Sequence, residues 1–462
     1  MPTPSSGHRT QRAALEARAE TIATREAERF AVARPNCRAA HEGRSGFLDN
    51  VPMLWMLDWP TPFPLVVDQA SGTRLVDLDG HAITDLCLGD TGAMFGHAPA
   101  PVVEALSRTA SRGLTTMLPT SDAAVVGKLL ARRFGLPFWQ VAATASDANR
   151  FALRVARAVT GRTKILVFDG CYHGAVDDTL VDRIDGRTVS RRSLLGQVAD
   201  LGATIVSIPF NDEGGMAAAL AAGDIACVLA EPVMTNCGMI LPQPGFHAAL
   251  RRLTRETGTL LLIDETHTLS SGLGGYTALQ GLEPDIFVAG KAVAGGVPAA
   301  VWGLSDEVAR RLEAVRRARP DGHSGIGTTL SGSALQLACL RSCLDQVMTA
   351  EVYQAMDRQA GRIATGLDAT VRRCGLAWHV ARVGARIEVV FAPEPVRDAD
   401  EARAAASHAI EKALHLALLN RGFLVTPFHN MVLVAPGLTD AEADAFVAAY
   451  GEVLTELSGG PA

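Results

Sequence analysis

The feature that most constrains the fold is a regular alternation of short apolar runs with longer helical stretches, which begins near residue 120. The runs are residues 164–168, 204–208, 226–229, 260–263 and 286–289. Between them lie stretches of about ten to fifteen residues with helical periodicity, the spacing typical of βαβ units. Each run is apolar on both faces, as expected of strands buried between two layers of helices. The alternation therefore predicts an α/β domain with a mostly parallel sheet.

The residues before this region follow a different pattern. Residues 9–35 are rich in Ala, Glu and Arg and predict an amphipathic helix, whereas residues 36–63 mix Pro, Trp and Met irregularly and predict a loop. Residues 64–68 and 74–79 predict two strands joined by a Ser-Gly turn. Residues 101–112 predict a helix that ends at a glycine.

The C-terminal part predicts a second lobe. A long helical region follows residue 335, and residues 386–391 and 422–425 are strand candidates with helices after them. We therefore predict that residues 76–334 form a large domain and that residues 335–462 form a small α+β domain. Residues 1–75 are expected to contribute to the small domain.

The composition excludes several classes of protein. The net charge of −6 provides no basic field for nucleic acid or an anionic membrane. Apolar runs such as residues 259–263 are too short to cross a bilayer, and the polar N-terminus MPTPSSGHRTQR has no signal-peptide core, so we expect a cytoplasmic protein. The eight cysteines form no CxxC pairs, which predicts neither a disulfide framework nor a metal site.

Lysine is rare in this chain, which draws attention to each one. Lys and Arg total 43 residues, but the only lysines are Lys128, Lys164, Lys291 and Lys412. Lys291 directly follows an apolar strand in PDIFVAGKAVAGGVP, residues 284–298. Ligands of parallel sheets bind beyond such strand ends, and an amine in apolar surroundings is a good nucleophile. The alternative is a structural lysine whose head reaches water.

Three other motifs offer groups that could hold a cofactor. In LLLIDETHT, residues 260–268, Asp264 ends a buried strand and could pair with a cationic ring nitrogen, or cap the next element. Small polar residues open the helix of residues 144–161, a possible phosphate site or an ordinary N-cap. FDGCYHG, residues 168–174, places an aromatic pair after a strand, either to stack on a flat ring or to form a surface turn.

The order and separation of these motifs carry a resemblance. Further segments agree with it: LVDLDGHAITDL at residues 75–86, GAMFGHAPAPVVEAL at 92–106 and AEPVMTNCGMILPQPGF at 230–246. Over roughly residues 60–450 the sequence resembles the fold-type-I pyridoxal-phosphate enzymes. It is most similar to class III aminotransferases, in the branch with glutamate-1-semialdehyde aminomutase and β-amino-acid aminotransferases.

The resemblance implies a fold, a cofactor and residue roles. The fold is a large domain with a mostly parallel seven-stranded sheet between helices, plus a small α+β domain. Lys291 would bind pyridoxal 5'-phosphate as a Schiff base and later carry a proton, and Asp264 would pair with the pyridine nitrogen. The remaining implied contacts are Ala145 and Ser146 with the phosphate, Tyr172 and Thr266 with the faces of the ring, and Glu231 near its phenolic side.

The same resemblance implies a homodimer and also shows departures from the family pattern. GTTLSGSAL, residues 327–335, would bring Thr329 to the phosphate of the neighbouring subunit, with Thr328 as the alternative register. Thr144–Ala148 stands for the family's SGTEA, and Thr266 replaces a valine under the ring, where its hydroxyl needs a partner. His267 follows at a position where the family varies.

The substrate side is less defined by sequence. Relatives often place an arginine in the N-terminal loop, but residues 50–63 contain none, so we expect Met56 and Trp59 to form an apolar wall. Arg386 is a candidate carboxylate clamp, because its planar fork suits that group, or a surface strand residue. His173 and His429, the latter with Asn430 beside it, are further candidates for substrate contacts.

Three functional hypotheses follow. The first is a transaminase that moves an amino group from an amino compound to a separate keto or aldehyde acceptor. The second is an intramolecular aminomutase or a racemase on the same scaffold. The third is a cofactor-binding protein without catalysis, against which the intact Lys291 and Asp264 argue. Net transfer of the amino group from a donor to a separate acceptor distinguishes the first two.

Overall fold

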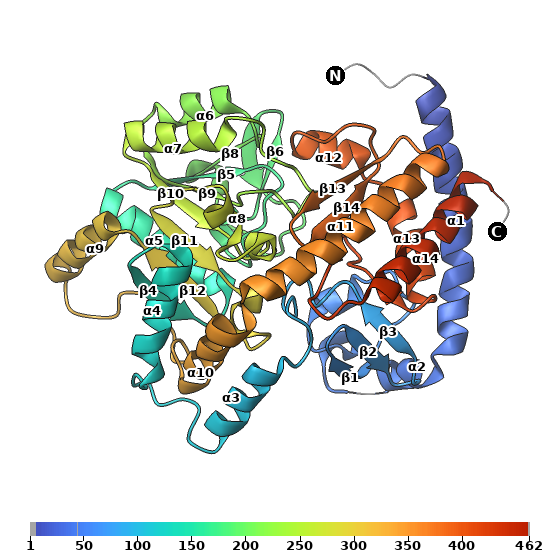
Figure 1. Ribbon diagram of the computed structural model, residues 1–462. Coiled ribbons are helices and arrows are strands. Elements are labelled where there is room, and N and C mark those ends of the chain that lie inside the picture. Colours follow the sequence, from blue (N-terminus) through green and yellow to red (C-terminus); the bar gives the residue numbers. More distant parts are fainter. Residues whose placement is uncertain (1–5, 44, 461–462) are drawn as a thin grey trace.

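A computed structural model describes residues 6–43 and 45–460, and its larger lobe is built on a seven-stranded sheet (Figure 1). The strand order is β4-β12-β11-β10-β9-β5-β8. Only β12 runs antiparallel to its neighbours, so the predicted mostly parallel sheet is confirmed. The strands are β4 (Phe138–Ala142), β5 (Lys164–Phe168), β8 (Ile205–Ile208), β9 (Ile225–Ala230), β10 (Leu260–Asp264), β11 (Ile286–Ala289) and β12 (Ala300–Leu304).

Helices cover both faces of this sheet, which explains why its central strands are apolar throughout. In β11, Phe287 and Ala289 pack into one hydrophobic core, whereas Ile286 and Val288 pack into the core on the other face. Alternate residues of a strand point to opposite faces, so both sets must be apolar. The helices of this lobe are α3 (Ala100–Ala110), α4 (Asp122–Phe134), α5 (Ala145–Thr160), α6 (Glu213–Leu220), α7 (Phe246–Thr257), α8 (Gly275–Leu279), α9 (Asp306–Ala318) and α10 (Ala334–Ser342).

The smaller lobe joins the two ends of the chain. The helix α1 (Ser6–Ala33) packs along α13 (His408–Leu419), and strand β15 (Phe423–Leu424) pairs in parallel with β3 (Ala82–Asp85). The other elements are α2 (Pro35–Glu42), β1 (Val67–Ser71), β2 (Arg74–Asp77), α11 (Ala350–Arg373), β13 (His379–Val383), β14 (Arg386–Val390), α12 (Ala399–Ala405), β16 (Val432–Leu433) and α14 (Asp440–Ser458). The hairpin of β6 (Val181–Ile184) and β7 (Arg187–Ser190) extends the larger lobe. The domain limits predicted after residues 75 and 334 stay predictions.

Two local predictions need correction. The expected loop at residues 36–63 begins with α2, because Pro35 occupies the first turn of a helix, where its missing N–H costs nothing. The strand expected at residues 64–68 instead runs from Val67 to Ser71. Its antiparallel register with β2 is set by the turn at Gly72, whose φ of 56° suits glycine.

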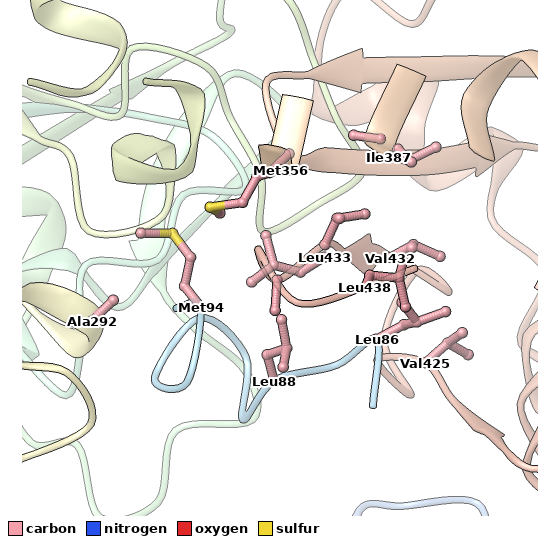
Figure 2. Close-up of a cluster of buried hydrophobic side chains, with 14 of the residues drawn as sticks. Leu86, Leu88, Met94, Ala292, Met356, Ile387, Val425, Val432, Leu433 and Leu438 are labelled. Carbon is pink, nitrogen blue, oxygen red and sulfur yellow. The ribbon is translucent and has the colours of Figure 1, made fainter. Parts of the chain in front are cut away.

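A buried cluster at the junction of the lobes fixes the segment between β3 and α3. Met94 of this segment points toward Met356 of α11, whereas Leu86 and Leu88 lie on the side of Leu433 of β16 (Figure 2). All five side chains are fully buried. Residues 89–92 are therefore held at the junction of the lobes although they have no regular secondary structure. No helix within residues 6–43 and 45–460 combines the length and apolar character needed to span a membrane.

Candidate active site

A cavity of about 380 Å³ lies beyond the carboxyl ends of the parallel strands. Glu231 follows β9, Asp264 ends β10, and Lys291 follows β11 after one glycine. Parallel strands bring their carboxyl ends to one edge, so side chains distant in the sequence meet there. Side chains or backbone lining the cavity come from Trp55, Gly92, Ala143, Thr144, Ala145, Ser146, Tyr172, Gly174, Glu231, Asn236, Asp264, Thr266, His267, Lys291, Gly296, Val297, Pro298 and Ala299.

Asp264 is held as a carboxylate at the floor of this cavity. Its Oδ2 accepts hydrogen bonds from Asn149 Nδ2 at 2.8 Å and pairs with His173 Nδ1 at 3.0 Å. Its Oδ1 accepts from the backbone N–H of Thr266 at 3.0 Å. Burial by itself would raise the pKa of Asp264, but the hydrogen bond and charge of His173 outweigh it and lower the pKa to about 2. A fixed negative charge therefore faces the cavity.

Lys291 begins a short 3-10 turn, Lys291–Ala294, at the wall of the cavity, and its backbone conformation is unusual for a lysine. Its φ is 50°, in the left-handed region that costs energy for a residue with a side chain. Its Nζ lies 2.5 Å from Asp90 Oδ2 and 2.6 Å from His267 Nε2. The amine is thus fixed between an acid and an imidazole at the cavity surface.

His267 connects Lys291 to Glu231 through a buried hydroxyl. His267 Nδ1 lies 2.7 Å from Thr235 Oγ1, which in turn lies 2.7 Å from Glu231 Oε2. Asn236 Nδ2 donates to the other carboxylate oxygen, Glu231 Oε1, at 2.9 Å. These contacts join the ends of β9 and β10 at the cavity.

The start of α5 forms a cradle on a third side. Thr144 caps the helix by accepting from the backbone N–H of Asp147 at 3.1 Å. The N–H groups of Ala145 and Ser146, which line the cavity, have no partner within the helix. Ser146 Oγ accepts from the backbone N–H of Ala175 at 3.0 Å. Helix N-termini of this kind favour anions through their N–H groups and dipole.

Two aromatic side chains form a further part of the cavity wall. Tyr172 and Trp55 both line it, and their ring centroids lie 5.7 Å apart at an angle of 58°. Trp55 belongs to a short 3-10 turn, Leu54–Leu57, in the N-terminal segment, and half of its surface is exposed. This part of the wall is therefore apolar and comes from a loop rather than from the sheet.

Comparison with known families matches residues 56–454 to the family described as Aminotransferase class-III. The chain belongs to the class III aminotransferase family. The resemblance read from the sequence motifs is thereby confirmed, and so is the fold class.

Three class III relatives bear closely on the function. A structure described as a glutamate-1-semialdehyde-aminomutase from Pseudomonas aeruginosa PAO1 has a TM-score of 0.93 and 46% identity, covering 96% of this chain and 99% of that one. Glutamate-1-semialdehyde 2,1-aminomutase of Desulfosudis oleivorans is 31% identical over 85% of this chain and 92% of its own length. A β-phenylalanine aminotransferase from Variovorax paradoxus has a TM-score of 0.83 and 25% identity, covering 94% and 97%.

Pyridoxal phosphate, the cofactor of class III enzymes, fits the residues of the cavity. A variant of the Pseudomonas protein was crystallised in complex with PMP, the amine form of this cofactor. The ionised Asp264 suits a protonated ring nitrogen, and Thr266 Oγ1 is buried without a hydrogen-bond partner in the described structure, as expected of a hydroxyl placed against a ligand. The site residues themselves stay predictions.

The cavity brings together most of the predicted cofactor residues, but its lining includes none of the predicted substrate residues. Ala145, Ser146, Tyr172, Glu231, Asp264, Thr266 and Lys291 line it. His173 lies behind Asp264, fully buried. Thr329 is exposed and lines a different cavity, together with Thr328.

The other predicted substrate residues lie outside the cavity lining. Trp59 packs edge-on against His415, and Met56 is exposed beside Trp55. His429 Nε2 lies 3.0 Å from the backbone oxygen of Asn236.

The alternative interpretation of Arg386 as a surface strand residue is wrong. Arg386 is fully buried, and its Nε donates to the backbone oxygen of His267 at 3.0 Å and to Ser270 Oγ at 3.2 Å. Its Nη2 also donates to Thr91 Oγ1. Burial lowers the pKa of the Arg386 guanidinium, with the charge of Asp90 opposing this. Through these contacts Arg386 fixes the backbone of the segment from His267 to Ser270.

Sequence reasoning missed several members of the site. Asp90 and Trp55 lie outside the long helices and strands, and Thr235 and Asn149 lie within motifs that were singled out for other residues. For Trp55 the sequence held one signal, because the loop of residues 50–63 is apolar and contains no arginine. From this loop we predicted Met56 and Trp59, and not Trp55, as the apolar wall. The pairing of Asp90 with Lys291 spans 201 residues and had no local signature.

Proposed function

We propose that this class III enzyme moves an amino group within one substrate molecule, as an aminomutase, using pyridoxal phosphate held by Lys291. The observation that carries this proposal is the 46% identity, over nearly the whole of both chains, with a protein described as a glutamate-1-semialdehyde-aminomutase. The curated relatives at 31% identity carry the same name. These relatives favour intramolecular transfer over the transaminase hypothesis that motifs alone placed first.

The residues around the cavity have distinct tasks in this proposal. When bound, pyridoxal phosphate provides a ring that accepts electron density from the carbon beside the amino group. Asp264 keeps the ring nitrogen protonated, because its carboxylate is ionised and fixed by three hydrogen-bond partners. Lys291 holds the cofactor and carries a proton on Nζ between neighbouring carbon atoms. The N–H groups at the start of α5 bind the phosphate.

Transamination between two substrates is the second candidate, and one feature of the cavity favours it. Among the described residues that line the cavity there is no arginine or second lysine to bind a substrate carboxylate, and Trp55 offers an apolar wall instead. The similarity to a β-phenylalanine aminotransferase is consistent with an apolar substrate group.

The test is turnover of glutamate 1-semialdehyde without an added amino acceptor. We expect each active site to convert many molecules to the isomer whose amino group has moved to the neighbouring carbon. If each site converts only about one molecule and an added keto acid restores turnover, the reaction is instead a transamination. Lys291→Ala should abolish either reaction, whereas Lys128→Ala, the same change at an exposed lysine of α4, should not.

A further inference from the structure

The amine of Lys291 contacts two polar neighbours. Asp90 Oδ2, at 2.5 Å from Nζ, forms an ion pair with it. His267 Nε2, at 2.6 Å from the same nitrogen, can accept a hydrogen bond only if it carries no proton. The hydrogen bonds around His267 decide which of its two nitrogens is protonated.

The contacts of Glu231 decide which atoms donate and which accept in the hydrogen-bonded series Glu231–Thr235–His267. A carboxylate only accepts, so the Thr235 hydroxyl, 2.7 Å from Glu231 Oε2, must donate its one proton there. The Thr235 backbone N–H donates to the same oxygen at 3.2 Å. Thr235 Oγ1 can then only accept from His267 Nδ1, 2.7 Å away. His267 therefore carries its proton on Nδ1, and the lone pair on Nε2 faces Lys291.

The surroundings of His267 favour the neutral ring at rest. Burial lowers the pKa of His267, and the charges of Lys291 and Arg386 lower it further, against the opposing charge of Asp90. Arg386 also fixes the backbone of His267 through its carbonyl oxygen. A neutral, oriented imidazole in contact with an ammonium group can act as a proton acceptor.

We propose that His267 is the acid–base partner of Lys291, taking the proton from Nζ onto Nε2 and returning it later in the cycle. In the forward step one N–H bond of the lysine ammonium breaks and the Nε2–H bond of an imidazolium forms. Lys291 is left with its lone pair, and Thr235 and Glu231 stabilise the positive ring. This inference rests on the proposed role of Lys291 as the cofactor lysine, which needs a free amine to attack a carbonyl carbon.

The first test is the protonation pattern of His267 in the cofactor-free protein, measured by long-range ¹H–¹⁵N spectra with labelled histidine. His267→Gln identifies its signals among those of the twelve histidines. We expect the proton on Nδ1 in the wild type and in Thr235→Ser, which keeps the hydroxyl, and loss of this preference in Thr235→Val. A proton on Nε2 in the wild type would overturn the inference, and so would an unchanged pattern in Thr235→Val.

The second test is the rate at which the cofactor-free protein captures pyridoxal phosphate covalently at neutral pH, followed by absorbance. His267→Gln should slow capture about 10²-fold, the usual scale of general acid–base catalysis, and added imidazole should restore the rate in His267→Gly. His379→Gln is the matched control, because the ring of His379 in β13 bonds, within the described structure, only the backbone oxygen of Ala392 just after β14. Unchanged melting temperatures check the fold of each variant.

The outcomes separate this inference from the proposed function. If Lys291→Ala abolishes capture but a folded His267→Gln captures at the wild-type rate, His267 is not the acid–base partner and only this inference fails. A slow His267→Gln without imidazole rescue of His267→Gly would also overturn it, because a positioning effect alone would explain the loss. If Lys291→Ala captures as well as the wild type, the proposed function fails first.

Discussion

Asp264 and Glu388 are both buried carboxyl groups, yet their surroundings shift their pKa values in opposite directions. Asp264 has hydrogen-bond donors on both oxygens, and its pKa falls to about 2. Glu388, in β14, has one buried oxygen without a partner. Burial raises the pKa of Glu388 to about 8, and the charge of Glu411 adds to the shift while Arg386 opposes it. The first group is held charged and the second is held neutral at neutral pH.

This contrast predicts how stability depends on pH. The unfolded pKa of Glu388 is about 4.3, so the folded state binds the extra proton between about pH 4.3 and pH 8. The stability due to Glu388 is fully present below the unfolded value and is lost as pH rises through the folded value. Glu388→Gln should remove this loss and raise the free energy of unfolding at pH 9 by about 1–3 kcal/mol relative to wild type.

Denaturant titrations at pH 5 and pH 9 measure this effect. Glu394→Gln, the same change at an exposed position, should unfold like the wild type at both pH values. If Glu388→Gln follows the wild-type pH dependence, then Glu388 is ionised in the folded protein.

Single residues also show how far sequence reasoning reached. Lys291 and Asp264 could be predicted because a strand end beside an apolar run is visible locally. Asp90 could not be predicted. The loop that contains it has positive φ angles at the non-glycine residues Leu88, Asp90 and Thr91, and no local sequence pattern predicts such a conformation. The loop is held by buried contacts with residues far along the chain, such as Leu433.

At the scale of elements, the loop that follows strand β5 approaches the start of helix α5 closely at a glycine. Gly174 follows β5 with a φ of 89°, and a Cβ atom there would collide with Ser146 Oγ. The first turn of α5, which we propose as the phosphate site, can therefore lie beside the Tyr172 loop only because residue 174 has no side chain.

Gly174→Ala should displace Ser146 and weaken pyridoxal phosphate binding by at least about tenfold, equivalent to about 1.4 kcal/mol. Equilibrium dialysis of the cofactor measures this. Gly161→Ala is the matched control, because Gly161 ends the same helix with a φ of 69° but a Cβ there would meet no atom. It should cost stability without changing cofactor affinity. Equal affinities for Gly174→Ala and wild type would place the phosphate elsewhere.

Elements with strong sequence periodicity were predicted well. Elements whose limits or partners depend on pairing with another strand were predicted poorly. The five apolar runs all became strands of the large sheet. β1 was displaced along the chain because its register depends on β2. β15 was expected as a strand, but its pairing with β3 joins segments more than three hundred residues apart, and only the folded chain fixes such a partner.

At the scale of the whole molecule, the predicted homodimer depends on a surface around Thr329. Thr329 lines a cavity of about 400 Å³ with Met117 and Leu118, and Met117, Leu118 and Leu330 are strongly exposed. A contiguous exposed apolar surface often marks a protein interface. The resemblance to the family implies that this surface faces a second subunit and that Thr329 serves the partner's phosphate.

Subunit mixing tests this arrangement. Lys291→Ala and Thr329→Arg should each be inactive alone, but mixed dimers should recover activity, because one of the two sites then has an intact lysine and an intact threonine from opposite chains. If Thr329 served the site of its own chain, both sites of the mixed dimer would be damaged and mixing would recover nothing. Light scattering should give twice the chain mass of 48.6 kDa.

The central claim is that Lys291 binds the cofactor, and covalent trapping tests it most directly. The protein would be loaded with pyridoxal phosphate, reduced with borohydride, digested and mapped by mass spectrometry. With only four lysines in the chain, the assignment is unambiguous. We predict that the cofactor is found on the peptide that contains Lys291 and that Lys291→Ala carries none. Attachment at Lys128, Lys164 or Lys412 with Lys291 unmodified, or no attachment at all, would contradict the account.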